Sequence, residues 1–486
     1  MTRIPTMETL ERLALIVGEK GVIRENDRKA PYLQEWRGLW RGATPLILRP
    51  SSTDEVSRLM AIAHETGTVI VPQSGNTGLV GGQTPNADGS EVLLSLDRMT
   101  RIIEVDASDY SLTAEAGATL KSIQDAASSV DRLFPLSLAS EGSCRIGGNL
   151  STNAGGVNVL AYGNARDLCL GLEVVLADGR ILKGLKKLRK DNTGYDLRNI
   201  FIGAEGTLGI ITAATLKLFP KPKCHDTAFV AVPNVEAALD LLTLVKDCAG
   251  NRVVAFELVP ERGLQFTEKH MNARRPLGTV SPWYVLFELA DATAELAGDV
   301  LEQAMTRGLV LDGTLAQTES QRQELWLIRE KLSESQKFEG GSIKHDVSVP
   351  VSKVPQFIAE ASAALDDFMP DTRLVCFGHL GDGNMHFNVS QPLGMDKQAY
   401  LSQWKPMNDV VHGVTVKFGG SISAEHGIGV LKREDMRWFK SEVELDVMRG
   451  LKALFDPKGI LNPGKVLPDN LDLLSVPTNE RHSSQA

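Results

Sequence analysis

The 486-residue sequence lacks the features of several common protein classes. It has no run near 18 uninterrupted apolar residues, so no transmembrane helix is expected. It has no excess of positive charge: 52 Lys and Arg against 61 Asp and Glu give a net charge of −9, so we expect no nucleic-acid partner. Its five cysteines form no CxxC pair and its first residues form no signal peptide, a combination typical of reduced thiols in a cytoplasmic protein.

Two nucleotide-binding motifs are also missing. The sequence contains neither GxGxxG nor GxxxxGK[ST], which disfavours a nicotinamide-dependent dehydrogenase and a P-loop enzyme. Glycine is nevertheless concentrated, because 20 of the 44 glycines lie in the segments 75–82, 142–163, 203–209, 378–383 and 419–429. Glycine is costly in regular structure and favoured where backbone turns sharply or approaches a ligand, so these segments are candidate binding sites.

The order of the predicted elements indicates several domains. From Thr44 onward, strand-like runs alternate with helical ones, a pattern of α/β structure. The proline-punctuated stretch from Phe219 to Pro233 is the best candidate for a domain boundary. Beyond it, two long helical patterns alternate with apolar strands, as in an α+β domain whose helices pack on an antiparallel sheet.

Three glycine segments in the first half have the character of cofactor-binding loops. The segment PQSGNTGLVGG (72–82) follows an apolar strand, and its successive N–H groups would form a nest for an anion such as pyrophosphate. A loop of this kind is also often only a tight turn. The segment SEGSCRIGGNLSTNAGG (140–156) has almost no bulky residue and suits a planar ring, and GAEGTLGIIT (203–212) places a turn before a β-branched run.

In this order, the three segments resemble the FAD-binding domain of the vanillyl-alcohol oxidase / p-cresol methylhydroxylase flavoprotein family, over about residues 40–222. The resemblance implies two α/β subdomains around FAD. Some relatives attach the flavin covalently through a histidine in or near the first loop, where this sequence has Asn76, so we expect non-covalent FAD. The cofactor-binding residues that the resemblance implies, with Asn462 from a C-terminal turn, are Pro72, Ser74, Gly75, Asn76, Thr77, Gly78, Leu79, Gly142, Ser143, Gly147, Gly148, Asn149, Thr152, Asn153, Gly155, Gly206 and Ile211.

Two glycine-rich motifs in the second half carry three histidines, in FGHLGDGNMHFN (377–388) and GGSISAEHGIG (419–429). His386 and Asn388 are two residues apart and would point the same way on a strand. His379, His386 and Glu425 are a typical three-ligand set for a divalent metal that leaves a position open for substrate. A single histidine near glycine is more often a hydrogen-bonded core or turn residue, and spacing alone leaves the two interpretations about equal.

These two motifs resemble the D-2-hydroxyacid dehydrogenase branch of the same flavoprotein family, especially its D-2-hydroxyglutarate dehydrogenases. By that resemblance, His379, His386 and Glu425 would bind a zinc-like ion. Asn388 would contact substrate, and His426 would be the catalytic base. The chemistry is consistent, because a divalent ion lowers the pKa of a bound hydroxyl and a neutral histidine can take its proton.

A predicted helix over residues 325–333 and the strand-like run that follows it supply cations. Arg329 and Ser333 are four apart and share a helix face, and Lys344 follows in a strand-like run. Taken alone, Arg329 is most simply half of a surface ion pair. By the resemblance, Arg329, Ser333 and Lys344 bind the substrate carboxylate. Ser333 and His345 stand where a threonine and a tyrosine are familiar, which leaves the distal substrate pocket undefined.

Together the patterns and the resemblance imply an α+β fold with a two-subdomain α/β FAD-binding domain preceded by helices (1–222) and an α+β substrate-binding cap with an antiparallel sheet (223–411). A helical C-terminal region (412–470) would return to the flavin before a disordered tail (471–486). The expected reaction is oxidation of D-2-hydroxyglutarate to 2-oxoglutarate. The alternatives are a D-lactate dehydrogenase, a glycolate oxidase FAD subunit or a flavin-binding non-catalytic subunit. An electron-transfer flavoprotein or a quinone would accept the electrons; the sequence leaves the acceptor, the metal and a homodimer open.

Overall fold

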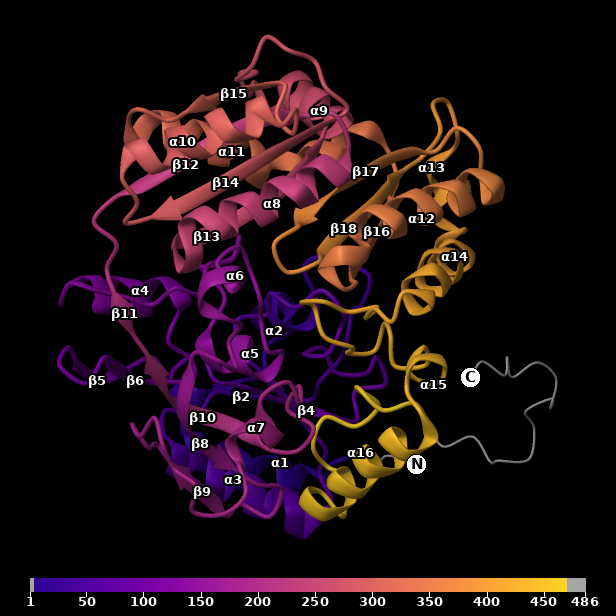
Figure 1. Ribbon diagram of the computed structural model, residues 1–486. Helices are drawn as coiled ribbons and strands as arrows, with labels where there is room; N and C mark the ends of the chain where they lie inside the picture. Colours follow the sequence, from indigo (N-terminus) through magenta and orange to yellow (C-terminus); the bar gives the residue numbers. More distant parts are fainter. Residues whose placement is uncertain (1–3, 470–486) are drawn as a thin grey trace.

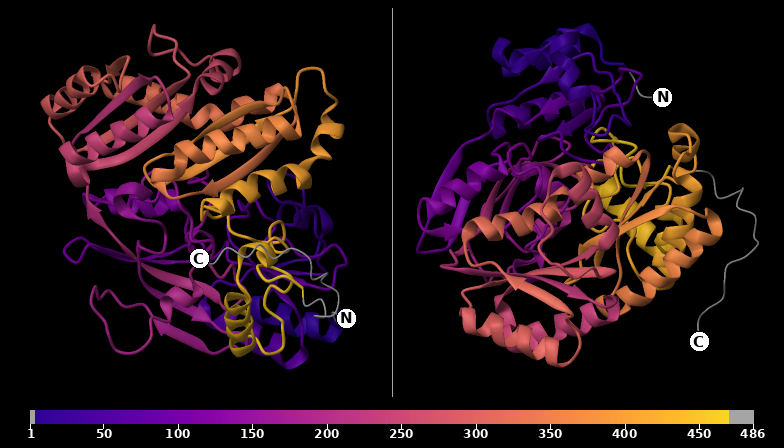
Figure 2. Two further views of the ribbon diagram at one scale, coloured as in Figure 1. Left: turned by 45° about the vertical axis from the view of Figure 1, so that its right-hand side comes forward. Right: turned by 90° about the horizontal axis from the view of Figure 1, so that it is seen from above.

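The computed structural model describes residues 4–469 as two packed domains (Figure 1). The N-terminal domain ends at β11 (Phe219–Pro220), and β12 (His225–Val232) begins the cap, which lies across it (Figure 2). The boundary between the two domains therefore lies in the proline-punctuated stretch from Phe219 to Pro233. Among the described helices, none is long and apolar enough to cross a membrane.

The first subdomain is built on a four-stranded sheet in the order β1-β2-β4-β3. Its strands and the helices beside them are β1 (Val22–Ile23), β2 (Ile47–Leu48), β3 (Ile70–Gln73), β4 (Val92–Ser95), α1 (Met7–Val17), α2 (Asn26–Leu33) and α3 (Thr53–Thr66). The hydroxyl of Ser52 accepts the N–H of Glu55 at the start of α3, and Gly67 ends the helix in the left-handed region with φ +71°. The sheet and α3 bury a shared apolar core, and β3 leads directly into the first glycine segment.

The second subdomain is a five-stranded antiparallel sheet in the order β5-β6-β10-β8-β9. Its elements are β5 (Ile102–Asp106), β6 (Ser111–Glu115), α4 (Leu120–Ser128), α5 (Ile146–Ser151), α6 (Val159–Tyr162), β8 (Cys169–Val175), β9 (Ile181–Gly184), α7 (Arg198–Phe201) and β10 (Ile210–Lys217). A short strand, β7 (Arg132–Leu133), pairs with β11. The Asp178-Gly179 turn joins β8 to β9 in a hairpin, with Gly179 at φ +87°.

The cap contains a seven-stranded antiparallel sheet in the order β15-β12-β14-β13-β17-β18-β16. Its further strands are β13 (Val253–Pro260), β14 (Trp283–Ala290), β15 (Asp312–Leu315), β16 (Ser342–Ser348), β17 (Arg373–His379) and β18 (Asn384–Ser390). The two halves of the sheet meet through two residue pairs between β13 and β17, Glu257 with His379 and Leu258 with Gly378. This seam places the motif histidines beside the first half of the cap.

Helices cover the two faces of the cap sheet unequally. One face packs against α8 (Val235–Ala249), α10 (Ala294–Thr306), α12 (Val354–Phe368) and α14 (Trp404–Lys417). The other face packs against α9 (Glu261–Met271) and α11 (Glu319–Ser335) near β12 to β14. The β16 to β18 end of that second face therefore presents its side chains toward the site described below.

After α13 (Lys397–Leu401) and α14, the chain returns to the N-terminal domain through α15 (Met436–Phe439) and α16 (Glu442–Phe455). Phe455 packs edge-on against Phe201 at 5.2 Å between ring centroids, and Asn462 N donates to the carbonyl of Ile70. The boundary expected at 411/412 falls inside α14, whose apolar side chains belong to the cap core. The tail expected at 471–486 lies outside the described residues. The mixed helices and sheets confirm the α+β class.

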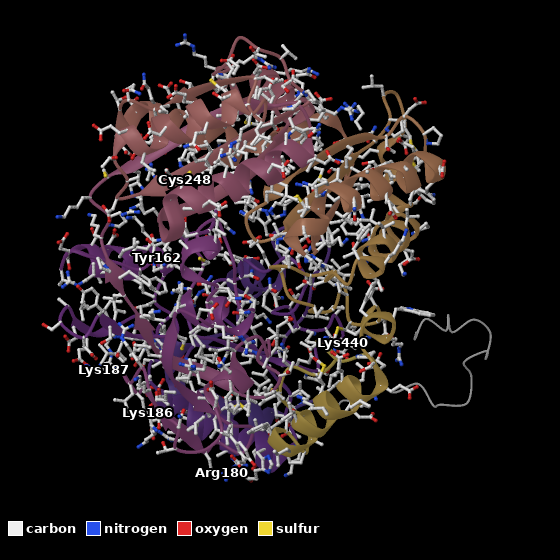
Figure 3. The ribbon with its side chains drawn as sticks, in the orientation of Figure 1. Tyr162, Arg180, Lys186, Lys187, Cys248 and Lys440 are labelled. Carbon is white, nitrogen blue, oxygen red and sulfur yellow. The ribbon has the colours of Figure 1, made fainter. Side chains whose placement is uncertain are left out.

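A cleft of about 650 Å³ lies beside the segment that joins the two domains. Its lining includes Tyr162 of α6 and Cys248 of α8, which are labelled in Figure 3. Its lining contains none of the residues expected to bind cofactor, metal or substrate. The residues expected to bind metal and substrate lie elsewhere, beside the pairing of β13 with β17 in the cap sheet.

Candidate active site

Strand alternation places the polar residues of β16 and β18 on one face of the cap sheet. Lys344 pairs with Asn388, and Asp346 pairs with His386, in antiparallel register. Because neighbouring residues of a strand point to opposite faces, these four side chains share a face. His345 points the other way: its Nδ1 lies 2.7 Å from the carbonyl oxygen of Phe387 and its ring is buried in the cap. His345, which stands where a tyrosine is familiar, therefore lies on the face of the sheet opposite to Lys344 and Asp346.

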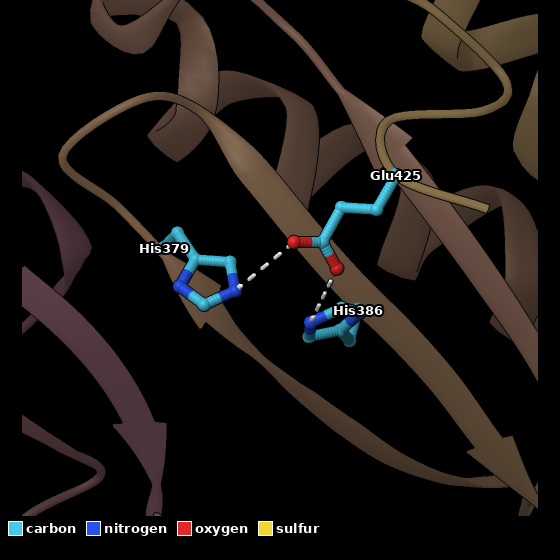
Figure 4. Close-up of side chains that lie close together, drawn as sticks. All are labelled: His379, His386 and Glu425. Carbon is cyan, nitrogen blue, oxygen red and sulfur yellow. Dashed lines mark ion pairs between the residues drawn. The ribbon is translucent and has the colours of Figure 1, made fainter. Parts of the chain in front are cut away.

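The two motif histidines and Glu425 converge where β17 ends and β18 begins (Figure 4). Nε2 of His379 lies 3.8 Å from Oε1 of Glu425, and Nε2 of His386 lies 4.0 Å from Oε2. One ligand atom from each residue falls within 4.8 Å of the others. Ligand atoms around a tetrahedral zinc ion are separated by about 3.4 Å, so this donor set fits a divalent cation after small rotations of the side chains.

A buried carboxylate on the neighbouring strand fixes the orientation of His379. Glu257 Oε1 lies 2.7 Å from Nδ1 of His379, and its Oε2 accepts a hydrogen bond from Nε of Arg329 at 2.6 Å. Burial by itself would raise the pKa of Glu257, but His379 and Arg329 outweigh it and lower that pKa to about 2. Glu257 in turn raises the pKa of His379 to about 9 against the effect of burial. With Nδ1 engaged, Nε2 of His379 is directed at Glu425, as in carboxylate–histidine–metal arrangements.

A second buried carboxylate, Asp346, organises the turn that carries Glu425 and His426. Its Oδ2 accepts the backbone N–H groups of Glu425 at 3.0 Å and His426 at 3.1 Å, and lies 3.2 Å from Nδ1 of His426. Its Oδ1 accepts the side-chain amide of Asn384 at 3.0 Å. Burial lowers the pKa of His426 to about 4, although Asp346 opposes the shift. His426 is therefore neutral near pH 7, with Nδ1 facing Asp346 and Nε2 left to act as a base.

The expected carboxylate-binding residues lie beside these two clusters. Arg329 projects from α11, where it is 8% exposed, and its guanidinium stacks 4.8 Å from the ring centroid of Phe377. It is thus half of a buried pair with Glu257 and not of a surface pair. Nζ of Lys344 donates to the backbone carbonyl of Ser333 at 3.3 Å, which brings β16 and the end of α11 together. Asn388 is buried on β18 directly opposite Lys344.

The first two glycine segments lie against each other in the N-terminal domain. Ser74 Oγ accepts the N–H of Gly148 at 3.1 Å, and a Cβ at Gly75 would lie 2.6 Å from the carbonyl oxygen of Ser143. Pro72 and Gly206 are similarly close, since a Cβ at Gly206 would lie 2.5 Å from the Pro72 ring. These contacts require glycine at both positions and join the three predicted FAD segments into one cradle.

The remaining predicted cofactor residues occupy different parts of this cradle. The side-chain amide of Asn76 donates to the carbonyls of Pro31 and Gln34, both at 3.0 Å. Buried amide oxygens of Asn149 and Asn462 accept no hydrogen bond within the described residues, which fits a ligand that has N–H donors such as a flavin or an adenine. Thr77, Gly78, Leu79, Thr152 and Asn153 are partly exposed in the two loops, Gly142 is exposed, Gly147 is the second residue of α5, and Ile211 is buried in β10.

The cradle and the cap cluster touch at Glu425. The N–H of Gly156 donates to Glu425 Oε1 at 2.7 Å, and a Cβ at Gly155 would lie 2.9 Å from the same oxygen. Glu205 makes a second junction, because its carboxylate accepts the N–H of Ile428 at 2.7 Å and of Gly429 at 2.9 Å. The turn with Glu425 and His426 is therefore held between the two domains.

The sequence interpretation missed the three acids that hold the site together. Glu257 is a single acid inside the apolar strand VVAFELVP, a pattern that signals a buried paired carboxylate. Asp346 is two residues after Lys344 and thus on the same strand face. Glu205 lies within the motif GAEGTLG but was not among the predicted site residues. The first two could have been found from strand periodicity, whereas their partners could not.

Comparisons with known proteins agree with this geometry. The family model described as "FAD linked oxidases, C-terminal domain" matches residues 221–466, and the model "FAD binding domain" matches residues 44–184. The mitochondrial D-2-hydroxyglutarate dehydrogenase of Danio rerio is 38% identical over 447 residues, covering 90% of this chain and 81% of the relative.

The chain belongs to the FAD-linked oxidases, in the group of the D-2-hydroxyglutarate dehydrogenases.

Members of this group occur in bacteria too. The D-2-hydroxyglutarate dehydrogenase of Xanthomonas citri pv. viticola is 36% identical, with 92% of this chain and 93% of the relative covered. A solved structure of p-cresol methylhydroxylase with substrate bound shares the fold, with a TM-score of 0.75 and 17% identity over 96% of this chain and 97% of that one. The expected vanillyl-alcohol oxidase type fold and the FAD-dependent oxidoreductase class are confirmed.

Proposed function

We propose that this FAD-linked oxidase converts D-2-hydroxyglutarate to 2-oxoglutarate. The observation that carries the proposal is the placement of His426, held by Asp346, next to the His379, His386 and Glu425 donor set. A base, a metal donor set and cations beside the flavin cradle are the parts that oxidation of a 2-hydroxy acid requires.

The residues divide the work between the two domains. When bound, FAD would supply the acceptor for the hydride on C2 of the substrate, and a divalent ion, proposed to be zinc, would supply the charge that lowers the pKa of the substrate hydroxyl. His379, His386 and Glu425 would hold the ion. Nε2 of His426 takes the hydroxyl proton, and Asp346 stabilises the imidazolium that results.

The substrate carboxylates are assigned to the cations of the cap. The terminal Nη groups of Arg329 remain for a carboxylate, because its Nε is bound to Glu257. Lys344 supplies a second positive charge, and the amide of Asn388 lies at the paired position of the neighbouring strand. Two cations suit a dicarboxylate better than a monocarboxylate.

The test is a comparison of acids. We expect D-2-hydroxyglutarate to give the highest kcat/KM among D-2-hydroxyglutarate, D-malate, D-lactate and glycolate with an artificial electron acceptor. Anaerobic bleaching of the flavin by the same acid would show that the flavin is the first acceptor. A wide kcat/KM advantage for D-lactate or glycolate would contradict the substrate assignment.

The base assignment has its own test. His426→Ala should slow flavin reduction by roughly 10²–10⁴-fold and leave FAD bound, because general-base catalysis contributes about that factor. His64→Ala, a histidine of α3 outside the site, is the matched control. Undiminished flavin reduction in His426→Ala would overturn the role.

Three finer points complete the proposal. FAD is proposed to be non-covalent, since Asn76 replaces the histidine of some relatives; acid precipitation should leave the yellow colour in the supernatant and a colourless pellet.

Electrons are proposed to pass to an electron-transfer flavoprotein or a quinone, which stopped-flow mixing of reduced enzyme with each acceptor would distinguish. A cytoplasmic location is proposed from the absence of a paired cysteine motif, and cell fractionation would test it.

A further inference from the structure

A turn of the N-terminal domain reaches the cap beside the substrate cations. The carboxylate of Glu35 accepts the N–H groups of Arg37, at 2.7 Å, and of Leu39, so it fixes the turn that follows α2. The ring of Trp36 in this turn lies 5.5 Å, centroid to Nζ, from Lys337 in the 3₁₀ helix Gln336–Glu339 of the cap. The turn thus bridges the two domains next to Lys344.

The side chain of Arg37 has no acidic partner in this position. Within residues 4–469 its backbone N–H is hydrogen-bonded to Glu35, whereas its guanidinium forms neither a hydrogen bond nor an ion pair. The residue is half-buried. A guanidinium that loses water without gaining a partner is costly, so the arrangement suits an anion supplied from outside the chain.

The charges that face Arg37 come from the cap and from the returning C-terminal segment. Arg37 lies close enough to lower the pKa values of Lys344, His426 and Lys432. Burial lowers the pKa of Arg37 itself, which Glu35 and Asp346 oppose.

Both of these acids are already occupied. The carboxylate of Glu35 caps its own turn, and the two oxygens of Asp346 accept hydrogen bonds from Asn384 and from the turn at Glu425. Among the described residues, neither Arg37 nor Lys344 forms an ion pair with an acid, so both positive charges remain uncompensated.

We propose that Arg37 binds the carboxylate that is remote from the reacting carbon, and so makes the site select 2-hydroxy dicarboxylates over monocarboxylates. The proposal rests on the proposed function and adds a specificity-determining residue from the other domain. Its neighbour Trp36 contacts Lys337 of the cap, so Arg37 is on the N-terminal side of the domain interface, and its charge acts on Lys344 of the cap. Its planar fork can take one carboxylate with two parallel hydrogen bonds, which a lysine cannot.

The experiment compares Arg37→Met and Arg37→Lys with Arg28→Met in the holoenzyme. Arg28 is the matched control, since it is an exposed arginine of the adjacent α2 that pairs with Glu25. We expect Arg37→Met to raise KM for D-2-hydroxyglutarate roughly 10–100-fold, the loss typical of a charge-assisted hydrogen bond, and to leave kcat and kcat/KM for D-lactate within about threefold. Arg37→Lys should lose less, and Arg28→Met nothing.

Calorimetric titration with glutarate and butyrate separates this proposal from the substrate assignment. Glutarate is a non-reacting dicarboxylate and butyrate a monocarboxylate, so their binding can be measured without turnover. Weaker glutarate binding in Arg37→Met, with butyrate binding unchanged, supports the role of Arg37 even if another acid proves to be the preferred substrate.

Two results would overturn the proposal. One is unchanged glutarate binding in Arg37→Met; the other is an equal loss for glutarate and butyrate, which would mean that Arg37 acts on the domain interface in general. If Arg37→Met fails to retain FAD, the test rests on Arg37→Lys. Loss of the planar guanidinium should weaken glutarate binding severalfold in this variant, and unchanged binding would contradict the role of Arg37.

Discussion

The N-terminal domain and the cap build their parts of the site from different chemical groups. In the N-terminal domain, glycine loops approach one another closely and offer backbone N–H groups, as Gly148 does to Ser74 and Gly156 does to Glu425. In the cap, side chains on neighbouring strands converge, and each reactive group is held by a buried acid. The glycine loops can approach one another only because they lack side chains. The side chains of the cap cluster keep their positions only because buried acids bind them.

The difference predicts that the two parts can be damaged separately. A substitution in the cap cluster should remove metal and activity but leave FAD bound. A substitution that adds atoms to the loops should disturb whatever lies against the backbone. Glu425 is the test of this separation, because it belongs to the cap cluster and contacts a glycine loop.

The largest effect is expected from Glu425→Gln. The amide keeps the size of the side chain but removes the charge that a divalent cation requires, so metal should be lost and the rate of flavin reduction should fall about 10³-fold or more. Elemental analysis, FAD absorbance and anaerobic reduction measure the three quantities. Glu360→Gln, an exposed acid of α12, is the control. Simultaneous loss of FAD would mean that the two parts are not separable.

A smaller effect is expected from Gly155→Ala. The added Cβ would lie 2.9 Å from Glu425 Oε1, so the carboxylate has to move and metal affinity and kcat should fall roughly 10–100-fold. Gly298→Ala in α10 adds a methyl group where nothing lies within 4 Å and serves as the control. Unchanged kinetics in Gly155→Ala would show that the loop does not constrain the cluster.

Glu257→Gln tests the support of His379 from the neighbouring strand. The loss of the carboxylate should weaken metal binding by about 10–100-fold, the usual cost of removing an outer partner of a histidine ligand. At saturating metal, kcat should recover most of its value. Competition with a chelator measures the affinity, and Glu319→Gln on the exposed face of α11 is the comparison. Metal affinity equal to that of the unsubstituted protein would contradict the role of Glu257.

The pH dependence of dicarboxylate binding should follow Lys344. Burial, with the nearby charges of Arg37 and Lys337, lowers the pKa of Lys344 to about 8. The protonated lysine attracts a carboxylate, so kcat/KM for D-2-hydroxyglutarate should fall as pH rises through about 8. The same profile for D-lactate should be flatter, because it has no second carboxylate. Parallel profiles for both acids would remove Lys344 from the specificity site.

The smallest effect is expected from Ser52→Ala at the start of α3. Loss of the hydrogen bond to the N–H of Glu55 should cost about 1 kcal/mol of the free energy of unfolding. Kinetic constants should not change, because the helix supports the core and not the loops. Denaturant unfolding measures the loss, and any change in KM would link this helix to the site.

Local patterns were sufficient for much of the fold and for the identity of the motif residues. Ser52 and Gly67 are the cap residues of α3, and Asp178-Gly179 is the turn of the β8–β9 hairpin; residues of these types are typical of such positions. The histidines were found because glycine-rich motifs are unusual in sequence. The side of the sheet on which His345 lies was left open by the sequence, since its register on β16 decides which face it occupies.

The glycine loops, the periodicity of the strands and the candidate metal ligands follow from neighbouring residues along the chain and can be recognised without a structure. The acids that hold the site residues in place cannot, because their partners are distant in sequence. Glu257 meets His379 across 122 positions, and Asp346 meets the turn at Glu425 across 79. A buried carboxylate is stable only beside its partners, and sheet order and domain packing bring such partners together.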